Sequence, residues 1–377
     1  MNILINALLL NNRFSGMQYS TENLLRAISE LTPTGNKIEV LLSQDYAGNL
    51  NTNKNLKINK LAFSTLNRVR RIYYENFELL PYFNKNKFSL YHSTSNILPY
   101  FAKVPSVLTI HDLVPVDYPE YSSIETSIYY RLFLSRSIHK AKKIIAVSNK
   151  VKEDIINRYG IDPVKIHVVY HGVGEEFKKI HDPQFLKLVI EKYKLPKSFL
   201  LFIGNLEPRK NLLRVIDAFI HLKKHQQINQ KLVIAGKNGW EYESIYQKVK
   251  LEKMEDEIIF TGYLDRNDLP SIYSLCSLFV FPSLYEGFGL PVLEAMACEA
   301  PVMISDRGAL PEITDQISPQ ANAFDVQDIA NKIHLLLTNP DIRNKNIQHG
   351  MVRAKSFTWK KTAEETLKVY NHILEAS

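Results

Sequence analysis

Cysteine is nearly absent from the 377-residue chain, which has only Cys276 and Cys298. Neither lies in a CxxC or Cys/His cluster, so neither a structural zinc site nor a disulfide framework is indicated. We expect two reduced thiols packed as small apolar side chains. The sequence also has no apolar run of the roughly 20 residues that cross a bilayer, and its first residues do not resemble a signal peptide. These absences predict a cytoplasmic protein.

Glycine is scarce as well, with 14 residues, but seven of them fall between positions 204 and 308. Four of these, Gly204, Gly236, Gly262 and Gly287, follow predicted strands directly or within a few residues. Ligands of open α/β sheets bind at the carboxyl ends of strands, where a glycine lets the backbone approach a phosphate. Turn geometry alone would also select glycine. Charged residues in the same turns favour the ligand interpretation.

Acidic residues are in short supply only in the first half of the chain. The net charge is +8, and residues 1–172 contain 21 lysines and arginines against 13 acidic residues, whereas residues 173–377 contain 26 of each. The excess favours an anionic partner for the first half, such as a membrane surface, a phosphorylated acceptor or nucleic acid. No nucleic-acid recognition motif accompanies the charge, so we do not expect nucleic acid to be the partner.

Short apolar strands alternate with helical stretches along the whole chain, which contains 45% hydrophobic residues. This alternation predicts an α/β fold of two domains, each a parallel sheet covered by helices on both faces. The boundary is expected after the glycine turn at 172–174, giving domains 1–174 and 175–356, and a last helix in 357–377 that packs back onto the first domain. The expected strands are 2–7, 38–43, 56–61, 90–93, 106–110, 143–147, 167–170, 199–203, 231–235, 258–261, 278–281 and 301–304.

The segment from Phe281 to Ala297 is the most informative part of the sequence. A buried strand is followed by a loop with Glu286, and a helix then begins near Pro291 and carries Glu294. The backbone N–H groups of Gly287, Phe288, Gly289 and Leu290 can converge on an anion at the helix start. The two carboxylates can accept hydrogen bonds from sugar hydroxyls. By spacing alone two glutamates eight apart occur by chance, and Glu294 could serve the helix dipole.

This segment resembles the E-x7-E signature of the retaining GT-B glycosyltransferases, in particular family 4. The form Glu-Gly-Phe-Gly-Leu-Pro-Val-Leu-Glu-Ala-Met-Ala is close to its commonest version. The resemblance implies a GT-B fold, with two Rossmann-like domains facing a cleft. It assigns Glu286 to the donor sugar and Glu294 to the nucleotide ribose.

A second turn, from Gly204 to Asn211, also follows a predicted strand and precedes a helix. Two adjacent basic residues are usually solvated surface, but this position suits a diphosphate, and the resemblance assigns Arg209 and Lys210 to it. Positive charge there would replace a metal ion, and no D-x-D segment is found, so we expect no metal and no cofactor. By resemblance the turn with Tyr263 and Leu264 holds the nucleotide base.

In the first half, His111 and Asp112 end an apolar strand and resemble the family's cleft histidine segment. A lone histidine is more often structural, and Asp112 could cap a turn. Ser148 and Asn149 resemble the family's Val-Ser turn, where Ser148 could cap a helix and Asn149 face the cleft. The family's glycine-rich turn corresponds to residues 12–19, in which Gly16 is the single glycine, a departure that affects acceptor contacts.

These features predict a metal-independent retaining transferase that moves a hexose from a nucleotide sugar to a saccharide or lipid-linked saccharide in surface-polysaccharide synthesis. The preferred transferred sugar is mannose, with GDP-mannose as its donor. Rhamnose, fucose, glucose and N-acetylhexosamine donors share the motifs. The competing interpretations are a sugar phosphorylase, an epimerase and a non-catalytic nucleotide-sugar sensor, although an epimerase would lack the full E-x7-E segment.

Residues 66–83 allow two interpretations. Apolar residues recur at helical spacing, so they could form a core-facing helix. Arg68, Arg70 and Arg71 lie beside this face, so the helix could instead dock on an anionic membrane and place the protein at its inner surface. The apolar positions are Leu66, Val69, Tyr73, Phe77 and Leu80, with Tyr74 and Phe83 adding aromatic bulk.

Overall fold

The computed structural model describes residues 2–11, 15–32, 37–48, 50 and 56–375. The chain divides into two compact units, one formed by residues 1–172 with 357–377 and the other by residues 173–356. The boundary inferred from the sequence, after Gly174, lies next to this division. The last helix belongs to the first unit. Among the described residues, no helix is both long enough and apolar enough to span a bilayer.

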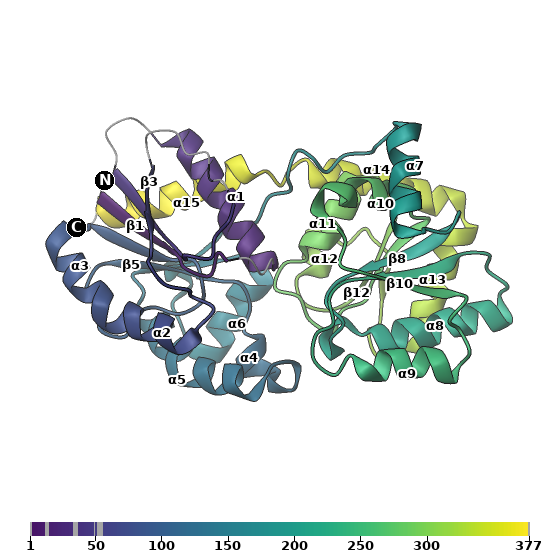
Figure 1. Ribbon diagram of the computed structural model, residues 1–377, viewed down its shortest axis with the longest axis horizontal. Helices are drawn as coiled ribbons and strands as arrows, with labels where there is room; N and C mark the ends of the chain where they lie inside the picture. Colours follow the sequence, from purple (N-terminus) through teal and green to yellow (C-terminus); the bar gives the residue numbers. More distant parts are fainter. Residues whose placement is uncertain (1, 12–14, 33–36, 49, 51–55, 376–377) are drawn as a thin grey trace. The chain divides into compact units, whose positions relative to one another are not determined.

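The first unit is built on one parallel sheet with the strand order β3-β2-β1-β4-β5-β6-β7 (Figure 1). Its inner strands are almost fully buried, as continuous apolar runs between helices require. The strands are β1 (Asn2–Ala7), β2 (Lys37–Leu42), β3 (Leu56–Lys60), β4 (Leu90–Ser93), β5 (Ser106–Ile110), β6 (Lys143–Ala146) and β7 (Ile166–Val168).

Helices cover the first sheet, and α15, from the far end of the chain, lies beside α1 (Figure 1). A π-helical turn, η1, joins α2 to α3. The helical elements are α1 (Gly16–Leu31), α2 (Arg68–Tyr73), η1 (Tyr74–Glu78), α3 (Leu79–Asn86), α4 (Val114–Asp117), η2 (Pro119–Tyr121), α5 (Ile124–Lys140), α6 (Asn149–Tyr159), η3 (Pro163–Lys165) and α15 (Trp359–Leu374).

The second unit contains a parallel sheet with the order β10-β9-β8-β11-β12-β13. In chain order this is 3-2-1-4-5-6, the order of a Rossmann sheet. The strands are β8 (Phe199–Ile203), β9 (Lys231–Ala235), β10 (Ile258–Gly262), β11 (Leu278–Phe281), β12 (Val302–Ser305) and β13 (Gln320–Ala321). The helical elements are α7 (Pro183–Tyr193), η4 (Pro208–Lys210), α8 (Leu212–His225), α9 (Glu243–Leu251), η5 (Arg266–Asp268), α10 (Leu269–Leu275), α11 (Leu290–Ala297), α12 (Leu310–Ile313), α13 (Val326–Thr338) and α14 (Pro340–Ala354).

The expected α/β class and both parallel sheets are confirmed, with strand ends within about two residues of those expected. Several elements were not identified from the sequence, among them α7, α13, α14 and β13. The polar stretch 175–197 contains α7, of which only Val189 is buried. Strand β13 has only two residues, too few to show a pattern.

Buried polar contacts attach α15 to the first sheet. The hydroxyl of Tyr370 lies 2.6 Å from Nδ1 of His92 on β4, and Nε2 of His92 lies 2.8 Å from the hydroxyl of Thr109 on β5. Burial lowers the pKa of His92 to about 3, and the neighbouring His111 acts in the same direction. His92 is therefore neutral in the folded protein at neutral pH and well below it.

We predict that the first unit loses stability as pH falls below about 6.5. Below that value His92 is protonated in the unfolded chain but stays neutral in the folded one, which removes about 1.4 kcal/mol per pH unit. His92→Gln should reduce this dependence on pH. Denaturant unfolding followed by Trp359 fluorescence in a Trp240→Phe background reports on the first unit. An equally steep loss between pH 6.5 and 4.5 in the His92→Gln protein would contradict the prediction.

Candidate active site

The second sheet reverses its strand order between β8 and β11, which are neighbours although β9 and β10 separate them in the chain. The connections from their carboxyl ends leave in opposite directions, and ligands of open α/β sheets bind in the crevice that this reversal opens. The turn after β8 carries Arg209 and Lys210, and the loop after β11 carries Glu286. The topology therefore brings together the two segments that the sequence selected separately.

Both basic side chains reach the carboxylate of Glu286. Nζ of Lys210 lies 2.6 Å from Oε1, and Nη1 of Arg209 lies 3.0 Å from Oε2. The same Nη1 donates to the backbone oxygen of Tyr285 at 2.8 Å, and Nη2 pairs with Glu207 at 2.8 Å. Burial by itself would raise the pKa of Glu286, but the two cations and the hydrogen bonds lower it to about 2. The carboxylate is therefore ionised at neutral pH.

Side chains that the sequence analysis did not select fix the Glu286 loop. Asn211 donates to the backbone oxygens of Pro282 at 2.9 Å and Ala323 at 2.7 Å. The hydroxyl of Ser305, at the end of β12, donates to the backbone oxygen of Ser283 at 2.6 Å. Asn211 belongs to the turn that the sequence singled out, whereas Ser305 has no local signal because its partner is 22 positions away.

Gly308 permits the closest backbone approach to Glu286. It has φ +61°, and a Cβ at this position would lie 2.5 Å from the backbone oxygen of Glu286 and 2.6 Å from its nitrogen. The next residue, Ala309, donates its N–H to that oxygen at 2.9 Å. The backbone of Glu286 is thus held by a turn that only glycine fits without displacement.

Glu294 lies on α11 and faces other partners than Glu286 does. Its carboxylate accepts from Arg266 at 3.0 Å and from the hydroxyl of Tyr273 at 3.2 Å. Burial raises its pKa, while Arg266 opposes the shift. Glu294 thus forms a salt bridge with Arg266, a structural role that its spacing from Glu286 did not indicate. Gly287 and Phe288 lie in the loop before α11, which begins at Leu290 and has Gly289 as its N-cap residue with φ +106°.

The remaining candidates of the second unit lie at strand ends. Gly204 follows β8 directly, and Gly236 packs so closely on it that a Cβ on Gly236 would lie 1.8 Å from the Gly204 oxygen. Tyr263 follows β10 and is 53% exposed, with Nζ of Lys237 4.5 Å from its ring centre. Leu264 is buried. Tyr263 is thus accessible for stacking, whereas Leu264 packs into the protein.

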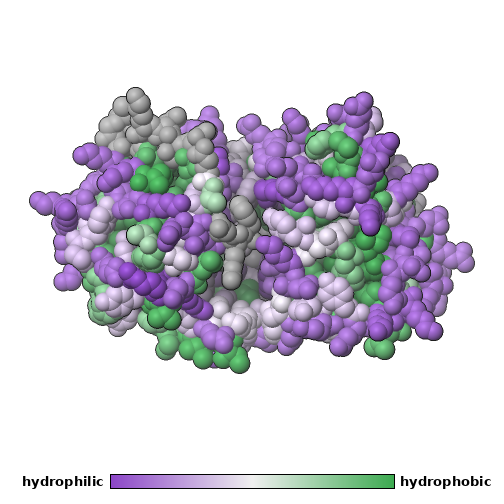
Figure 2. All heavy atoms as spheres, in the orientation of Figure 1, coloured by the Kyte–Doolittle hydropathy of each residue, from purple (hydrophilic) through white to green (hydrophobic). Residues whose placement is uncertain are grey.

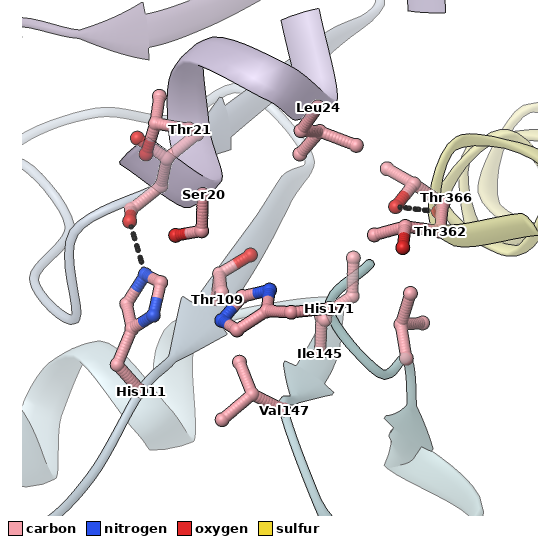
Figure 3. Close-up of a pocket in the computed structure, with 12 residues that line it drawn as sticks. Ser20, Thr21, Leu24, Thr109, His111, Ile145, Val147, His171, Thr362 and Thr366 are labelled. Carbon is pink, nitrogen blue, oxygen red and sulfur yellow. Dashed lines mark hydrogen bonds between the residues drawn. The ribbon is translucent and has the colours of Figure 1, made fainter. Parts of the chain in front are cut away.

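His111 lies in the first unit, at the carboxyl end of β5, and lines a small pocket (Figure 3). Its Nε2 lies 2.9 Å from the backbone oxygen of Thr94, and its ring stacks on His171 with 5.4 Å between ring centres. Burial lowers the pKa of His111. Because a carbonyl oxygen only accepts, Nε2 carries the proton and Nδ1 of the neutral ring can accept a hydrogen bond.

The other first-unit candidates occupy turns. Asp112 accepts from the N–H of Val114 at 3.1 Å, which is the turn cap considered as its second possible role. Ser148 caps α6 through the N–H of Val151 at 3.1 Å, as expected. Exposed Asn149 donates to the hydroxyl of Tyr170 at 2.7 Å, and Gly16 is the first residue of α1. Residues 12–14 of the glycine-poor turn lie outside the described residues.

Cys276 and Cys298 are buried free thiols, as expected. Burial raises the pKa of Cys276 to about 12, so it is not a nucleophile at neutral pH. Within the described ranges, no three His, Cys, Asp or Glu side chains lie together in a way that could hold a metal ion.

Two family models match the chain, one in each half. The model of the "Glycosyltransferase Family 4" domain matches residues 14–177, and the model of "Glycosyl transferases group 1" matches residues 188–352.

Curated relatives extend this likeness. O-antigen chain mannosyltransferase B of Escherichia coli is 31% identical over 282 residues, 74% of this chain and 74% of that protein. The serotype-specific mannosyltransferase WbdA of the same species is 31% identical over 278 residues, 72% of this chain, which corresponds to only 34% of the longer relative.

Among solved structures, sucrose-phosphate synthase from Thermosynechococcus elongatus superimposes with a TM-score of 0.77. The match covers 100% of this chain and 99% of that one at 19% identity, so it supports the fold alone. With the matching family models, the 31% identity to a mannosyltransferase and the two Rossmann-like units, the chain belongs to the family 4 glycosyltransferases of the GT-B fold.

Proposed function

We propose that this glycosyltransferase transfers mannose from GDP-mannose to a saccharide or lipid-linked saccharide during surface-polysaccharide synthesis. The observation that carries the proposal is the convergence of Arg209 and Lys210 on Glu286 at the strand-order reversal of the second sheet. Two cations there can hold the diphosphate of a nucleotide sugar. The choice of mannose rests on the relatives, of which O-antigen chain mannosyltransferase B is an example.

The transfer is proposed to retain configuration and to need no metal ion. The acceptor oxygen bonds to the anomeric carbon on the face from which the diphosphate leaves, and a phosphate oxygen of the donor takes the acceptor proton. The bond from the anomeric carbon to phosphate breaks, and the nucleoside diphosphate departs. Arg209 and Lys210 stabilise the charge that develops on it, a role that a metal ion serves in other transferases.

Glu286 is suited to hold the donor sugar. Since its pKa is about 2, it accepts hydrogen bonds from sugar hydroxyls and does not serve as a proton donor. Its two cations occupy both carboxylate oxygens, which disfavours a nucleophilic role. In the first unit the neutral ring of His111 can accept a hydroxyl hydrogen bond at Nδ1, consistent with a place near the reacting sugar.

We predict that Arg209→Ala and Lys210→Ala each lower kcat for transfer by roughly two orders of magnitude. Losing one electrostatic contact to a leaving group costs about 3 kcal/mol of barrier. Transfer from GDP-mannose to an oligomannoside, measured with and without excess EDTA, gives the rates. Lys187→Ala, which removes an exposed lysine on α7, is the control and should keep the parent rate.

Near-parental rates in both site variants would remove the basic pair from the mechanism. Complete loss of parental activity in EDTA, with recovery on adding a divalent metal, would contradict metal independence. A chain that binds GDP-mannose but neither transfers nor hydrolyses it would be a sensor.

Gly308→Ala should lower turnover without removing any group that touches substrate. The added methyl group meets the backbone of Glu286 at 2.5–2.6 Å and must displace it. Because a misplacement of about 1 Å can cost roughly a hundredfold in rate, we expect a loss of that order in kcat. Gly160→Ala is the matched control, since Gly160 has φ +62° but nothing within 4 Å of its Cβ position. Equal kinetics in the two variants would exclude this role.

We further propose that the protein acts in the cytoplasm, peripherally at the inner membrane surface. Four of the five apolar positions in the 66–80 segment are exposed rather than in the core. Leu66 is 45%, Val69 78%, Tyr73 52% and Phe77 52% exposed. Phe77 contacts Phe101, and α5 adds exposed Ile124, Ile128 and Leu132. Figure 2 shows hydrophobic surface along the edge of the first unit where α2, α4 and α5 lie in Figure 1.

The arginines contribute differently from what the sequence suggested. Arg70 pairs with Glu78 at 2.6 Å, and Arg68 and Arg71 line a pocket, so the three are not a free basic strip. Exposed Arg131 and Arg136 on α5 lie in the same helix as the exposed isoleucines and are better placed to meet anionic lipid.

Replacing Val69, Tyr73 and Phe77 together by Ser should weaken binding to anionic vesicles about tenfold or more. Each of these side chains gains on the order of 1 kcal/mol or more when it enters the interface. Co-sedimentation at low salt measures the binding. The control replaces Leu188, Leu251 and Val352 by Ser, three similarly exposed apolar residues of the second unit. Failure of the parent protein to sediment with vesicles would end the membrane proposal.

A further inference from the structure

A second and larger pocket lies in the first unit, at the point where its sheet reverses strand order. This reversal falls between β1 and β4, and residues that follow both strands line the pocket. Its volume is about 290 Å³, against about 20 Å³ for the pocket beside His111. Only the larger one can enclose a sugar or a phosphate group. Its polar lining includes Asn11, Gln18, Arg68, Arg71, Glu75 and Tyr129.

Two arginines give this pocket its charge. Arg68 lies with its guanidinium 4.4 Å from the ring centre of Tyr129 and donates weakly to Thr126 at 3.4 Å. The side chain of Arg71 is only 14% exposed, and its ion pair with Glu75 is a distant one, 3.9 Å from Nε to the carboxylate. Nε of Arg71 has no hydrogen-bond partner among the described residues. Burying a guanidinium that lacks a hydrogen-bond partner at Nε costs free energy, unless a ligand accepts that hydrogen bond.

Glu75 compensates Arg71 only at long range. Its Oε1 accepts from the amide of Asn6 at 2.7 Å, whereas Oε2 is the atom 3.9 Å from Nε of Arg71. Burial raises the pKa of Glu75, although Arg71 opposes the shift. Oε1 of Gln18 is a second buried polar atom without a partner in the described part of the chain. Two arginines and at most one carboxylate leave the pocket with a net positive charge.

Helix α2, which supplies the arginines, has one face toward the pocket and one face exposed on the surface. Arg68, Arg71 and Glu75 recur at helical spacing and line the pocket, whereas Val69 and Tyr73 are exposed on the outer side. A group bound in the pocket therefore lies one helix away from the surface proposed to meet the membrane.

We propose that this pocket binds a phosphate group of the acceptor, with Arg71 and Arg68 as its ligands. The inference rests on the proposed function, and it adds that the acceptor is a phosphorylated saccharide. The donor diphosphate has its own cations, Arg209 and Lys210, in the other unit. The planar fork of arginine matches phosphate oxygens, and Tyr129 offers an aromatic face beside them.

The test compares two acceptors that differ only in a phosphate. Transfer and calorimetric binding are measured with a mannose disaccharide and with the same disaccharide carrying a phosphate at its reducing end, with the nucleotide site saturated by GDP in the binding experiment. Arg71→Gln should raise KM and Kd for the phosphorylated acceptor roughly ten- to a hundredfold, and leave those for the neutral acceptor unchanged. Arg71→Lys should restore part of the loss.

Arg70→Gln is the matched control, because Arg70 is the adjacent residue but pairs with Glu78 at the surface. It should leave both acceptors unaffected. Hydrolysis of GDP-mannose without acceptor separates the two hypotheses. If the parent protein neither hydrolyses nor transfers, the proposed function fails, whereas equal use of both acceptors by an active parent overturns only the phosphate site. Equal damage to both acceptors in Arg71→Gln and Arg71→Lys would assign Arg71 a structural role and also overturn it.

A third acceptor identifies the source of the phosphate. The same phosphorylated disaccharide is linked to a farnesyl chain and presented in phosphatidylcholine vesicles. A lower KM than for the soluble phosphate, lost on replacing Val69 and Tyr73 by Ser, supports a lipid-linked acceptor. An unchanged KM supports a soluble sugar phosphate held by the same pocket.

Discussion

Both sheets are parallel and both reverse their strand order once, and this constraint places the chemistry of the molecule. In a parallel sheet all carboxyl ends lie at one edge, and the reversal separates two neighbouring connections so that a crevice opens between them. In the second unit the reversal brings the turn after β8 to the loop after β11 and so creates the Arg209–Lys210–Glu286 cluster. In the first unit the same reversal opens the arginine-lined pocket.

The charged cluster is costly to bury, so the loops around it are held tightly. The side chains of Lys210 and Glu286 are only 10% and 11% exposed. Only close pairing offsets the free-energy cost of removing such charges from water. Asn211, Ser305 and Gly308 hold the backbone that carries them. In the proposed mechanism, a cluster fixed in this way presents positive charge to the leaving diphosphate with little reorganisation, which is how electrostatic catalysis gains its effect.

The segment from Arg68 to Asn86 carries both the arginines of the first-unit pocket and the side chains that are proposed to meet the membrane. A π-helical turn at Tyr74–Glu78 separates two α-helical parts, and such turns shift the register of a helix face. Before the turn, Val69 and Tyr73 face outward while Arg71 lines the pocket. After it, Leu79 and Phe83 are buried in the core. The core-facing interpretation is thus confirmed for the part after the turn, whereas membrane docking of the part before it stays a prediction.

The sequence by itself determined the fold class, nearly all strands, and the two segments that carry Arg209, Lys210 and Glu286. These follow from local signals, namely apolar runs, glycine turns and helix starts, together with one long motif. Strand β13, with two residues, was too short to be found, and α7, whose one buried residue is Val189, lies in a stretch that was interpreted as a polar connection. The partners of Glu294, the supports of Glu286 and the pocket around Arg71 join residues distant in the chain. Only tertiary structure decided these contacts, because strand order and helix packing, rather than neighbouring residues, determine which side chains meet.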